Sequence, residues 1–129
     1  MVERSLDRVA FGRPLAEQGV VQNQIAESRV EIDQARALCH LAAHVIDTQG
    51  NKAAKDLIAA AKVAVPRAAL ATIDRAIQVH GGAAVSDDTP LAAMWGWHRA
   101  MRLFDGPDEV HLRSLARSEL RRAPALPLR

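Results

Sequence analysis

Apolar side chains recur at helical spacing along most of the chain, most regularly between about residues 15 and 48. In this stretch the apolar and small residues alternate at spacings of four and three, which places them on one face of a helix. The predicted stripe contains Val21, Ile25, Ser28, Ile32, Ala35, Cys39, Ala42 and Ile46. Such a long helix needs packing partners, because intrinsic propensity alone does not stabilise it.

A second long helix is predicted from residue 51 to about residue 80. Gly50 suits the left-handed backbone that often ends a helix, and Asn51 is predicted to cap the next one. The predicted apolar face contains Ile58, Ala61, Val65, Ala69, Thr72, Ala76 and Val79. Because Pro66 lies inside this segment, we expect a kink there or two helices that meet at Pro66. Gly81 and Gly82 are predicted to end it.

Two shorter helices follow, each preceded by a start signal. Thr89 is predicted to cap the first and Pro90 to be its first helical residue. Its large apolar residues are Leu91, Met94, Trp95, Met101 and Leu103. The second starts near Pro107, which is followed by two acidic residues, and runs to about residue 122.

Long helices joined by short breaks predict an all-α fold, an up-and-down antiparallel helix bundle over residues 1–122. Residues 123–129 are predicted to be an irregular tail. The chain opens directly in a charged, amphipathic helical pattern without a capping residue, from which we expect its natural beginning to lie upstream.

Length and composition narrow the functional classes. The 129 residues suit one domain, and 49% hydrophobic with 25% charged residues argues against disorder. A net charge of +2 and only 3% aromatic residues give little support for nucleic-acid binding. No apolar run is long enough to span a membrane, and no signal peptide is recognisable. A single cysteine, Cys39, fits a reducing compartment, so a cytoplasmic location is expected.

The segment at residues 8–14 is not explained by packing a bundle. It places Arg8, Phe11 and Gly12 at a predicted junction between helices. A guanidinium can pair with phosphate and an aromatic ring can cover a flat ligand ring. The alternative from the residues alone is a capped turn anchored by Phe11.

Two further segments carry candidate chemistry. Gly81 and Gly82 follow a helix, where they expose backbone amides and permit close approach of a ligand, although a plain helix stop is the alternative.

Farther on, Asp105 precedes a helix and can point into a cleft, where burial under a substrate would make it a stronger base. Asp108 and Glu109 lie in the first turn and resemble charge complements to the helix dipole, and helix-capping chemistry for all three acids remains open.

The histidines do not predict a metal site. His40 and His44 are spaced so that both could face one ion, but no third ligand accompanies them and Cys39 points to a different face. A structural or surface role is the favoured interpretation. No Ser/His/Asp or Cys/His set can be argued from the remaining histidines either.

Taken in order and at these separations, the three segments make the chain resemble the C-terminal helical domain of the acyl-CoA dehydrogenase family of flavoenzymes. The resemblance covers about residues 3–119. It implies a longer enzyme with an N-terminal helical and a middle β domain, so this chain resembles a fragment that is inactive alone. It also implies FAD as cofactor, an acyl-CoA substrate oxidised to the 2,3-enoyl-CoA in fatty acid metabolism, and a homo-oligomer, either a dimer or a tetramer. An electron-transfer flavoprotein stays open as the electron acceptor.

The resemblance also assigns roles to individual residues. Asp105 falls where the family's catalytic glutamate usually sits, and Gly106 follows it beside the substrate. The implied FAD-binding residues are Arg8 at the phosphates, Phe11 near the adenine, Gln78, Gly81 and Gly82 at the adenosine diphosphate part, and the flavin-contacting stretch Pro107, Asp108 and Glu109. In the family, the groups that match Arg8, Phe11, Gln78, Gly81 and Gly82 serve the flavin of a neighbouring subunit.

Some positions depart from the family pattern. Asp105 is one methylene shorter than glutamate, so a substrate must sit closer or the backbone must shift. Pro107 replaces a common threonine, Ala84 replaces a common glycine, and Gly19 lies where many relatives have a flavin-contacting glutamine. Three alternatives remain: an acyl-CoA or nitroalkane oxidase relative, a non-catalytic helical oligomerisation module, and, more distantly, a small nucleic-acid-binding bundle.

Overall fold

The computed structural model describes residues 1–123, and the last six residues of the predicted tail lie outside them. The elements are α1 (Val2–Asp7), β1 (Val9–Ala10), β2 (Arg13–Pro14), the 3-10 helix η1 (Leu15–Glu17), α2 (Gly19–Gln49), α3 (Asn51–His80), the 3-10 helix η2 (Gly81–Val85), α4 (Leu91–Ala100) and α5 (Asp108–Arg122). These residues form one β-hairpin with two residues in each strand, and their other secondary-structure elements are helices. The all-α class is therefore confirmed.

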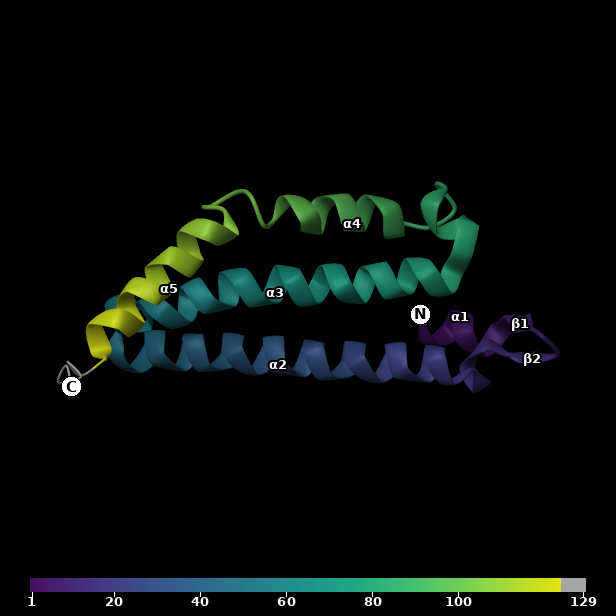
Figure 1. Ribbon diagram of the computed structural model, residues 1–129, viewed down its shortest axis with the longest axis horizontal. Coiled ribbons are helices and arrows are strands. Elements are labelled where there is room, and N and C mark those ends of the chain that lie inside the picture. Colours follow the sequence, from purple (N-terminus) through teal and green to yellow (C-terminus); the bar gives the residue numbers. More distant parts are fainter. Residues whose placement is uncertain (124–129) are drawn as a thin grey trace, which may run out of the picture.

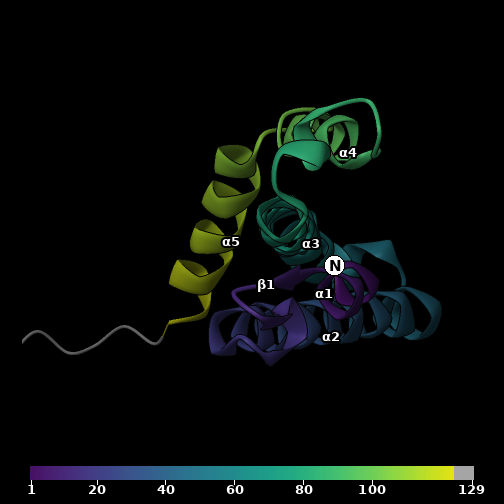
Figure 2. The same ribbon diagram turned by 90° about the vertical axis from the view of Figure 1, so that its right-hand side faces the viewer.

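The helix α3 is the centre of the molecule. α2 runs antiparallel to it on one side, α4 runs back along it on the opposite side, and α5 crosses it obliquely near its start (Figures 1 and 2). Because three helices pack on α3, its buried residues encircle more of its surface than a single stripe would. They are Ala54, Ala59, Val63, Pro66, Leu70, Ile73, Ala76 and Val79. Of the predicted apolar face, only Ala76 and Val79 are buried, and Ile58 is exposed, so that prediction of the buried face was largely wrong.

The helix α2 begins four residues later than predicted. The backbone N–H of Leu15 donates to the carbonyl of Arg8 at 2.8 Å, which ties residue 15 to the hairpin and not to the helix. A short 3-10 turn follows, and the α-helix starts at Gly19. Of the predicted stripe, Val21, Ser28 and Ala42 are buried, whereas Ile32 and Cys39 are exposed.

Two predicted helix starts are shifted by one residue. Asn51 is the first residue of α3 and not its cap, because Gly50, with a φ of 83°, already makes the turn between α2 and α3. Likewise α4 begins at Leu91, with Pro90 in the capping position. The Thr89 hydroxyl still accepts a hydrogen bond from the Leu91 N–H at 3.5 Å.

The helix α3 continues through Pro66, so the prediction of two helices meeting there is wrong. Proline has no N–H, and the carbonyl of Lys62 one turn earlier therefore loses its usual helical donor. Pro66 is buried where α3 faces the segment after α4.

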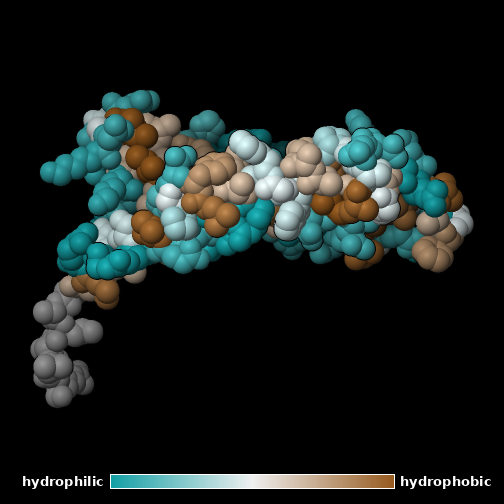
Figure 3. Space-filling model, turned by 90° about the horizontal axis from the view of Figure 1, so that it is seen from above, coloured by the Kyte–Doolittle hydropathy of each residue, from teal (hydrophilic) through white to brown (hydrophobic). Residues whose placement is uncertain are grey.

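The helix α4 has no buried residue, although its composition is apolar. Large hydrophobic side chains are exposed along η2, α4 and the turn that follows: Val85, Met94, Trp95, Trp97, Leu103 and Phe104. Figure 3 shows apolar patches among polar residues on the side of the molecule that carries α4. Within residues 1–123, no helix combines the length and the apolar character needed to cross a membrane.

Candidate functional site

Residues 8–14 lie between α1 and the helices that follow, as predicted, but they form a β-hairpin, which was not predicted. Val9 pairs with Pro14 and Ala10 with Arg13, and the connecting turn is made by Phe11 and Gly12 with φ of 54° and 78°. The Phe11 side chain is 97% exposed. The alternative of a turn anchored by Phe11 is therefore wrong, since the ring packs on nothing in the described chain.

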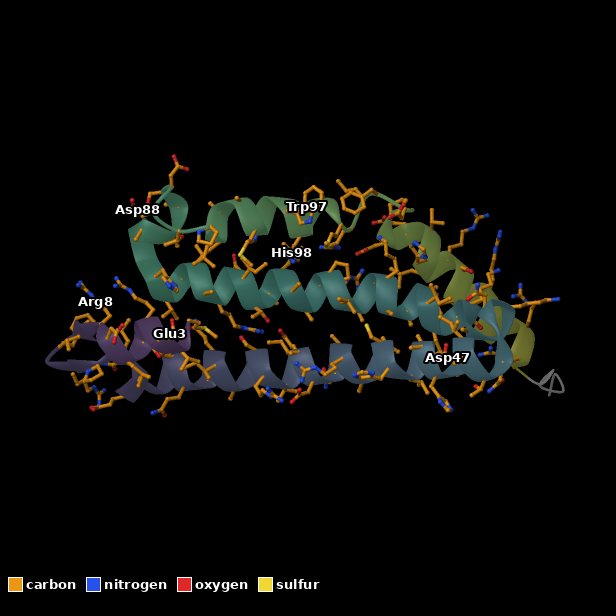
Figure 4. The ribbon with its side chains drawn as sticks, turned by 180° about the vertical axis from the view of Figure 1, so that it is seen from behind. Glu3, Arg8, Asp47, Asp88, Trp97 and His98 are labelled. Atoms are coloured by element: carbon orange, nitrogen blue, oxygen red, sulfur yellow. The ribbon has the colours of Figure 1, made fainter. Side chains whose placement is uncertain are left out.

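Arg8 lies at the junction between α1 and this hairpin and is exposed. Figure 4 shows its side chain at the outer end of the molecule, beyond Glu3. No ion pair involves Arg8 among residues 1–123. Its guanidinium is thus available to an anion. By contrast, Arg13 donates to the side-chain oxygen of Gln18 at 3.0 Å.

The second predicted segment closes α3. Gln78 is exposed in the last turn, and Gly81 ends the helix with a φ of 68°, a value that favours glycine. A Cβ added to Gly81 or Gly82 would meet no atom within 4 Å, so neither glycine is required by internal packing. The backbone around both residues is open to an approaching ligand.

The hairpin and the end of α3 lie at the same end of the bundle, where α2 begins (Figure 1). Packing of α1 against α3 links the two segments. The structure thus brings Arg8, Phe11, Gln78, Gly81 and Gly82 to one end of the molecule, although about 70 positions separate them in the sequence.

Asp105 lies at the opposite end of α4, in the turn that leads to α5. The ten residues of α4 span about 15 Å, so this turn is well separated from the hairpin end. Asp105 and Gly106 both have left-handed backbones, with φ of 55° and 93°. The Asp105 carboxylate is exposed and has no hydrogen bond or ion pair within residues 1–123. It is therefore free to act on a ligand.

The backbone of this turn is held from two helices. The Lys62 ammonium on α3 donates to the carbonyl oxygens of Met101 at 2.7 Å and Gly106 at 3.3 Å. On α5, His111 Nε2 lies 3.2 Å from the Asp105 carbonyl oxygen. A Cβ on Gly106 would stand 3.0 Å from the same His111 nitrogen, so a larger residue would crowd this contact.

Asp108 opens α5 as predicted, but its carboxylate does more than complement the helix dipole. Its side chain is only 2% exposed, and its Oδ2 accepts hydrogen bonds from Arg102 Nε at 2.8 Å and Arg67 Nε at 3.0 Å. Burial pushes the pKa of the Asp108 carboxyl upward, but the hydrogen bonds and charges of Arg102 and Arg67 outweigh burial and hold this pKa below its usual value. Its neighbours differ, since Pro107 is half-buried and Glu109 is exposed.

Lys62 and Arg67 were not among the residues singled out from the sequence, yet they hold the turn that carries Asp105. One signal pointed to Lys62, which is a lone cation in the otherwise apolar run of residues 57–66. Elsewhere, His40 and His44 are exposed on α2. Across residues 1–123 no three His, Cys, Asp or Glu side chains are grouped to hold a metal ion.

Comparison with known proteins links this geometry to one family. The family model for the C-terminal domain of acyl-CoA dehydrogenases matches residues 1–120. The "Probable acyl-CoA dehydrogenase FadE2" of Mycobacterium tuberculosis is 70% identical over 122 residues, which are 95% of this chain and 30% of that protein.

Solved structures agree with the sequence comparison. A structure from Mycobacterium abscessus is 48% identical, with a TM-score of 0.92 over 94% of this chain and 30% of its own. The butyryl-CoA dehydrogenase of Megasphaera elsdenii is 28% identical, with a TM-score of 0.85 over 92% of this chain and 30% of its own. The chain thus spans about a third of the length of the relatives that it matches.

Proposed function

This chain belongs to the acyl-CoA dehydrogenase family as a C-terminal domain, and from that premise we propose that it is part of an FAD-dependent enzyme that oxidises a saturated acyl-CoA thioester to the 2,3-enoyl-CoA. Because the chain spans only about 30% of its relatives, the reaction requires parts of the enzyme outside these residues. On this proposal the chain alone is inactive.

The exposed, unpaired carboxylate of Asp105 is the observation that carries the proposal. It stands on a turn with two consecutive left-handed residues, a backbone conformation that costs free energy and recurs at functional sites. Lys62 and His111 hold that backbone while leaving the carboxylate free. A rigid backbone with a free acidic side chain is what a positioned general base requires.

In the proposed reaction, the Asp105 carboxylate removes a proton from the carbon next to the thioester carbonyl. FAD, when bound, supplies the redox chemistry by accepting the β-hydrogen as a hydride. The pair of electrons left at the α-carbon forms the new C=C bond, and Asp105 ends protonated. Gly106 is assigned to the substrate side of this turn as the neighbour of the base, and its missing side chain leaves room for the ring of His111.

The residues at the hairpin end fit the phosphate and adenine parts of FAD. The Arg8 guanidinium is exposed and without an ion pair among the described residues, which suits a phosphate. The ring of Phe11 is uncovered, and the backbone at Gly81 and Gly82 is open. We assign these residues, with the exposed amide of Gln78, to hold the cofactor. Pro107 and Glu109 are assigned to the flavin side of the Asp105 turn, whereas the buried carboxylate of Asp108 is held by Arg67 and Arg102 and is not offered to a ligand.

The separation of the two ends supports a homo-oligomer, a dimer or a tetramer. α4 lies between the hairpin end and the Asp105 turn, so we propose that the two ends serve the FAD molecules of different subunits. The exposed apolar side chains along α4, such as Trp97 at 61%, are consistent with a face that another domain or subunit covers.

The direct test is anaerobic mixing of the assembled, FAD-loaded enzyme with a saturated acyl-CoA thioester. The proposal expects loss of the absorbance of oxidised flavin together with formation of the 2,3-enoyl-CoA. Rapid reoxidation of the reduced flavin by oxygen would favour an oxidase, whereas slow reoxidation by oxygen and rapid reoxidation by an electron-transfer flavoprotein would favour a dehydrogenase. A stable oligomer that holds no FAD would overturn the enzymatic proposal and favour an assembly module.

A further inference from the structure

The charged ammonium of Lys62 binds backbone carbonyl oxygens. Its ammonium forms no ion pair within residues 1–123, and donates instead to two backbone carbonyls, those of Met101 at 2.7 Å and Gly106 at 3.3 Å. These carbonyls lie on either side of Asp105 in the sequence. One side chain of α3 therefore closes the turn that presents the carboxylate.

The position of the Met101 carbonyl explains why a cation is favoured there. α4 ends at Ala100, and the Met101 carbonyl follows its last turn, where carbonyl oxygens lack helical donors and carry the negative end of the helix dipole. An ammonium can donate several hydrogen bonds at once and is favoured at this end of a helix. Lys62 thus acts as the cap of α4 from a neighbouring helix.

The stem of Lys62 is equally well accommodated. It lines a pocket of about 220 Å³ between α3 and the turn, together with apolar side chains. These are Ala61, Val65, Pro66, Met101 and Phe104. The Phe104 ring lies 5.8 Å, centroid to centroid, from the ring of Trp97. The Trp97 side chain points away from α3, whereas the side chain of the adjacent His98 points toward α3 (Figure 4). The apolar stem therefore packs along one wall while the ammonium reaches the backbone.

The turn needs such a tie because its backbone is strained. Asp105 has a φ of 55°, which a residue with a side chain rarely adopts, and Gly106 continues the left-handed conformation. Without Lys62, the loop keeps His111 at the Asp105 carbonyl and the Asp108 N–H, which donates to the Arg102 carbonyl at 3.2 Å. The N–H groups of Leu103 and Phe104 also still donate to the carbonyl of Ala100, at 2.8 and 3.2 Å. None of these contacts comes from α3, so the α4 side of the turn would lose its hydrogen bonds to the central helix.

We propose that Lys62 is a positioning residue for the Asp105 carboxylate, fixing the α4 side of the turn so that the carboxylate meets the α-proton of the substrate. This inference rests on the proposed role of Asp105 as the base. It assigns Lys62 a role through these two carbonyls and no contact with substrate or cofactor.

The test compares Lys62→Met with Lys62→Arg in the assembled, FAD-loaded enzyme. Methionine keeps an apolar stem and removes the donors, so kcat is expected to fall about tenfold to a hundredfold while KM changes less than about threefold. Arginine keeps the charge and the donors and is expected to recover part of the loss. Lys52→Met, at an exposed position of the same helix, is the control and is expected to leave kcat unchanged.

Hydrogen exchange supplies a readout that does not depend on turnover. In Lys62→Met, amides of residues 101–107 are expected to exchange faster, with those of α2 and the FAD content unchanged. Unchanged exchange in the turn would overturn the proposal, and so would an unchanged kcat. Equal loss of kcat and FAD content would also overturn it, because that pattern indicates general damage to the fold.

Asp105→Asn separates this inference from the proposed function. If this variant still transfers electrons at the parental rate, Asp105 is not the base, and the positioning role of Lys62 falls with the proposed function. If Asp105→Asn is inactive and Lys62→Met retains full kcat, only the inference about Lys62 fails.

Discussion

Arg67 on α3 and Asp108 on α5 meet at 3.0 Å, between Nε and Oδ2, although 41 positions separate them in the sequence. The Asp108 carboxylate, which also pairs with Arg102, is almost completely buried. This contact joins the central helix, the segment after α4 and the first turn of α5. It thereby fixes the exit of the turn whose other side is tied by Lys62.

Replacing Asp108 by asparagine is expected to lower the free energy of unfolding of the chain by about 3 kcal/mol, because two arginines lose a buried anionic partner. Urea denaturation measures this difference. Glu109→Gln is the matched control, since this neighbouring carboxylate is exposed and the expected change is within about 0.5 kcal/mol. Similar small effects for both variants would contradict the structural role of Asp108.

Acid is expected to destabilise the chain through two carboxylates. The pKa of Glu31 is lowered by its hydrogen bonds from Arg75, which outweigh partial burial, and that of Asp108 is lowered by its two arginines. A carboxyl whose pKa is lower folded than unfolded stabilises the fold above its unfolded pKa of about 4. That stabilisation is lost as the pH falls through the folded pKa.

Melting temperatures measured between pH 7 and pH 2 test this pH dependence. The parental chain is expected to lose stability below about pH 4. A double variant, Glu31→Gln with Asp108→Asn, is expected to be less stable at pH 7 but to show a flatter acid limb. An equally steep acid limb in the double variant would assign the acid sensitivity to other groups.

Two glycines are expected to respond to alanine in opposite directions. Gly106→Ala forces a side chain into a backbone with a φ of 93° and within 3.0 Å of His111, so a loss of about 1–2 kcal/mol is expected. Gly96 lies inside α4 with nothing within 4 Å of an added Cβ. Gly96→Ala is therefore expected to stabilise the chain by roughly 0.5–1 kcal/mol. Denaturant unfolding measures both, and a stabilising Gly106→Ala would contradict the described turn.

Phe11→Ala is expected to separate cofactor binding from stability. The ring is 97% exposed, so its removal should change the free energy of unfolding by less than about 0.5 kcal/mol. In the assembled enzyme, however, the affinity for FAD is expected to fall about tenfold, because a ring that covers the ligand is lost. Retention of parental FAD affinity would exclude Phe11 from the cofactor site.

Much of the helical fold could be predicted because apolar spacing is a local property of the sequence. The long helices ending near Gln49 and His80, and the start of α5 after Pro107, follow from periodicity and breaker residues. The hairpin was missed because its strands have two residues each, too few to show alternation. Its pairing depends on the Phe11–Gly12 turn, whose conformation the spacing does not reveal.

The candidate site was predictable only where its residues are neighbours in the chain. Asp105 stands out through its position before a helix, and the structure places it in an exposed turn. That its carboxylate faces a cleft stays a prediction. Lys62 and Arg67 reach this turn from more than 30 positions away, and such contacts depend on how α3 packs against the later helices. The burial of Asp108 was missed for the same reason, since its arginine partners come from two separate segments.

The most direct test of the account is the rate at which substrate reduces the flavin in Asp105→Asn, measured by rapid anaerobic mixing in the assembled enzyme. Asparagine has nearly the same shape as aspartate but cannot accept the α-proton as a base. If Asp105 is the base, the reduction rate is expected to fall about a thousandfold below the parental rate, with FAD content unchanged. Reduction at the parental rate would contradict it.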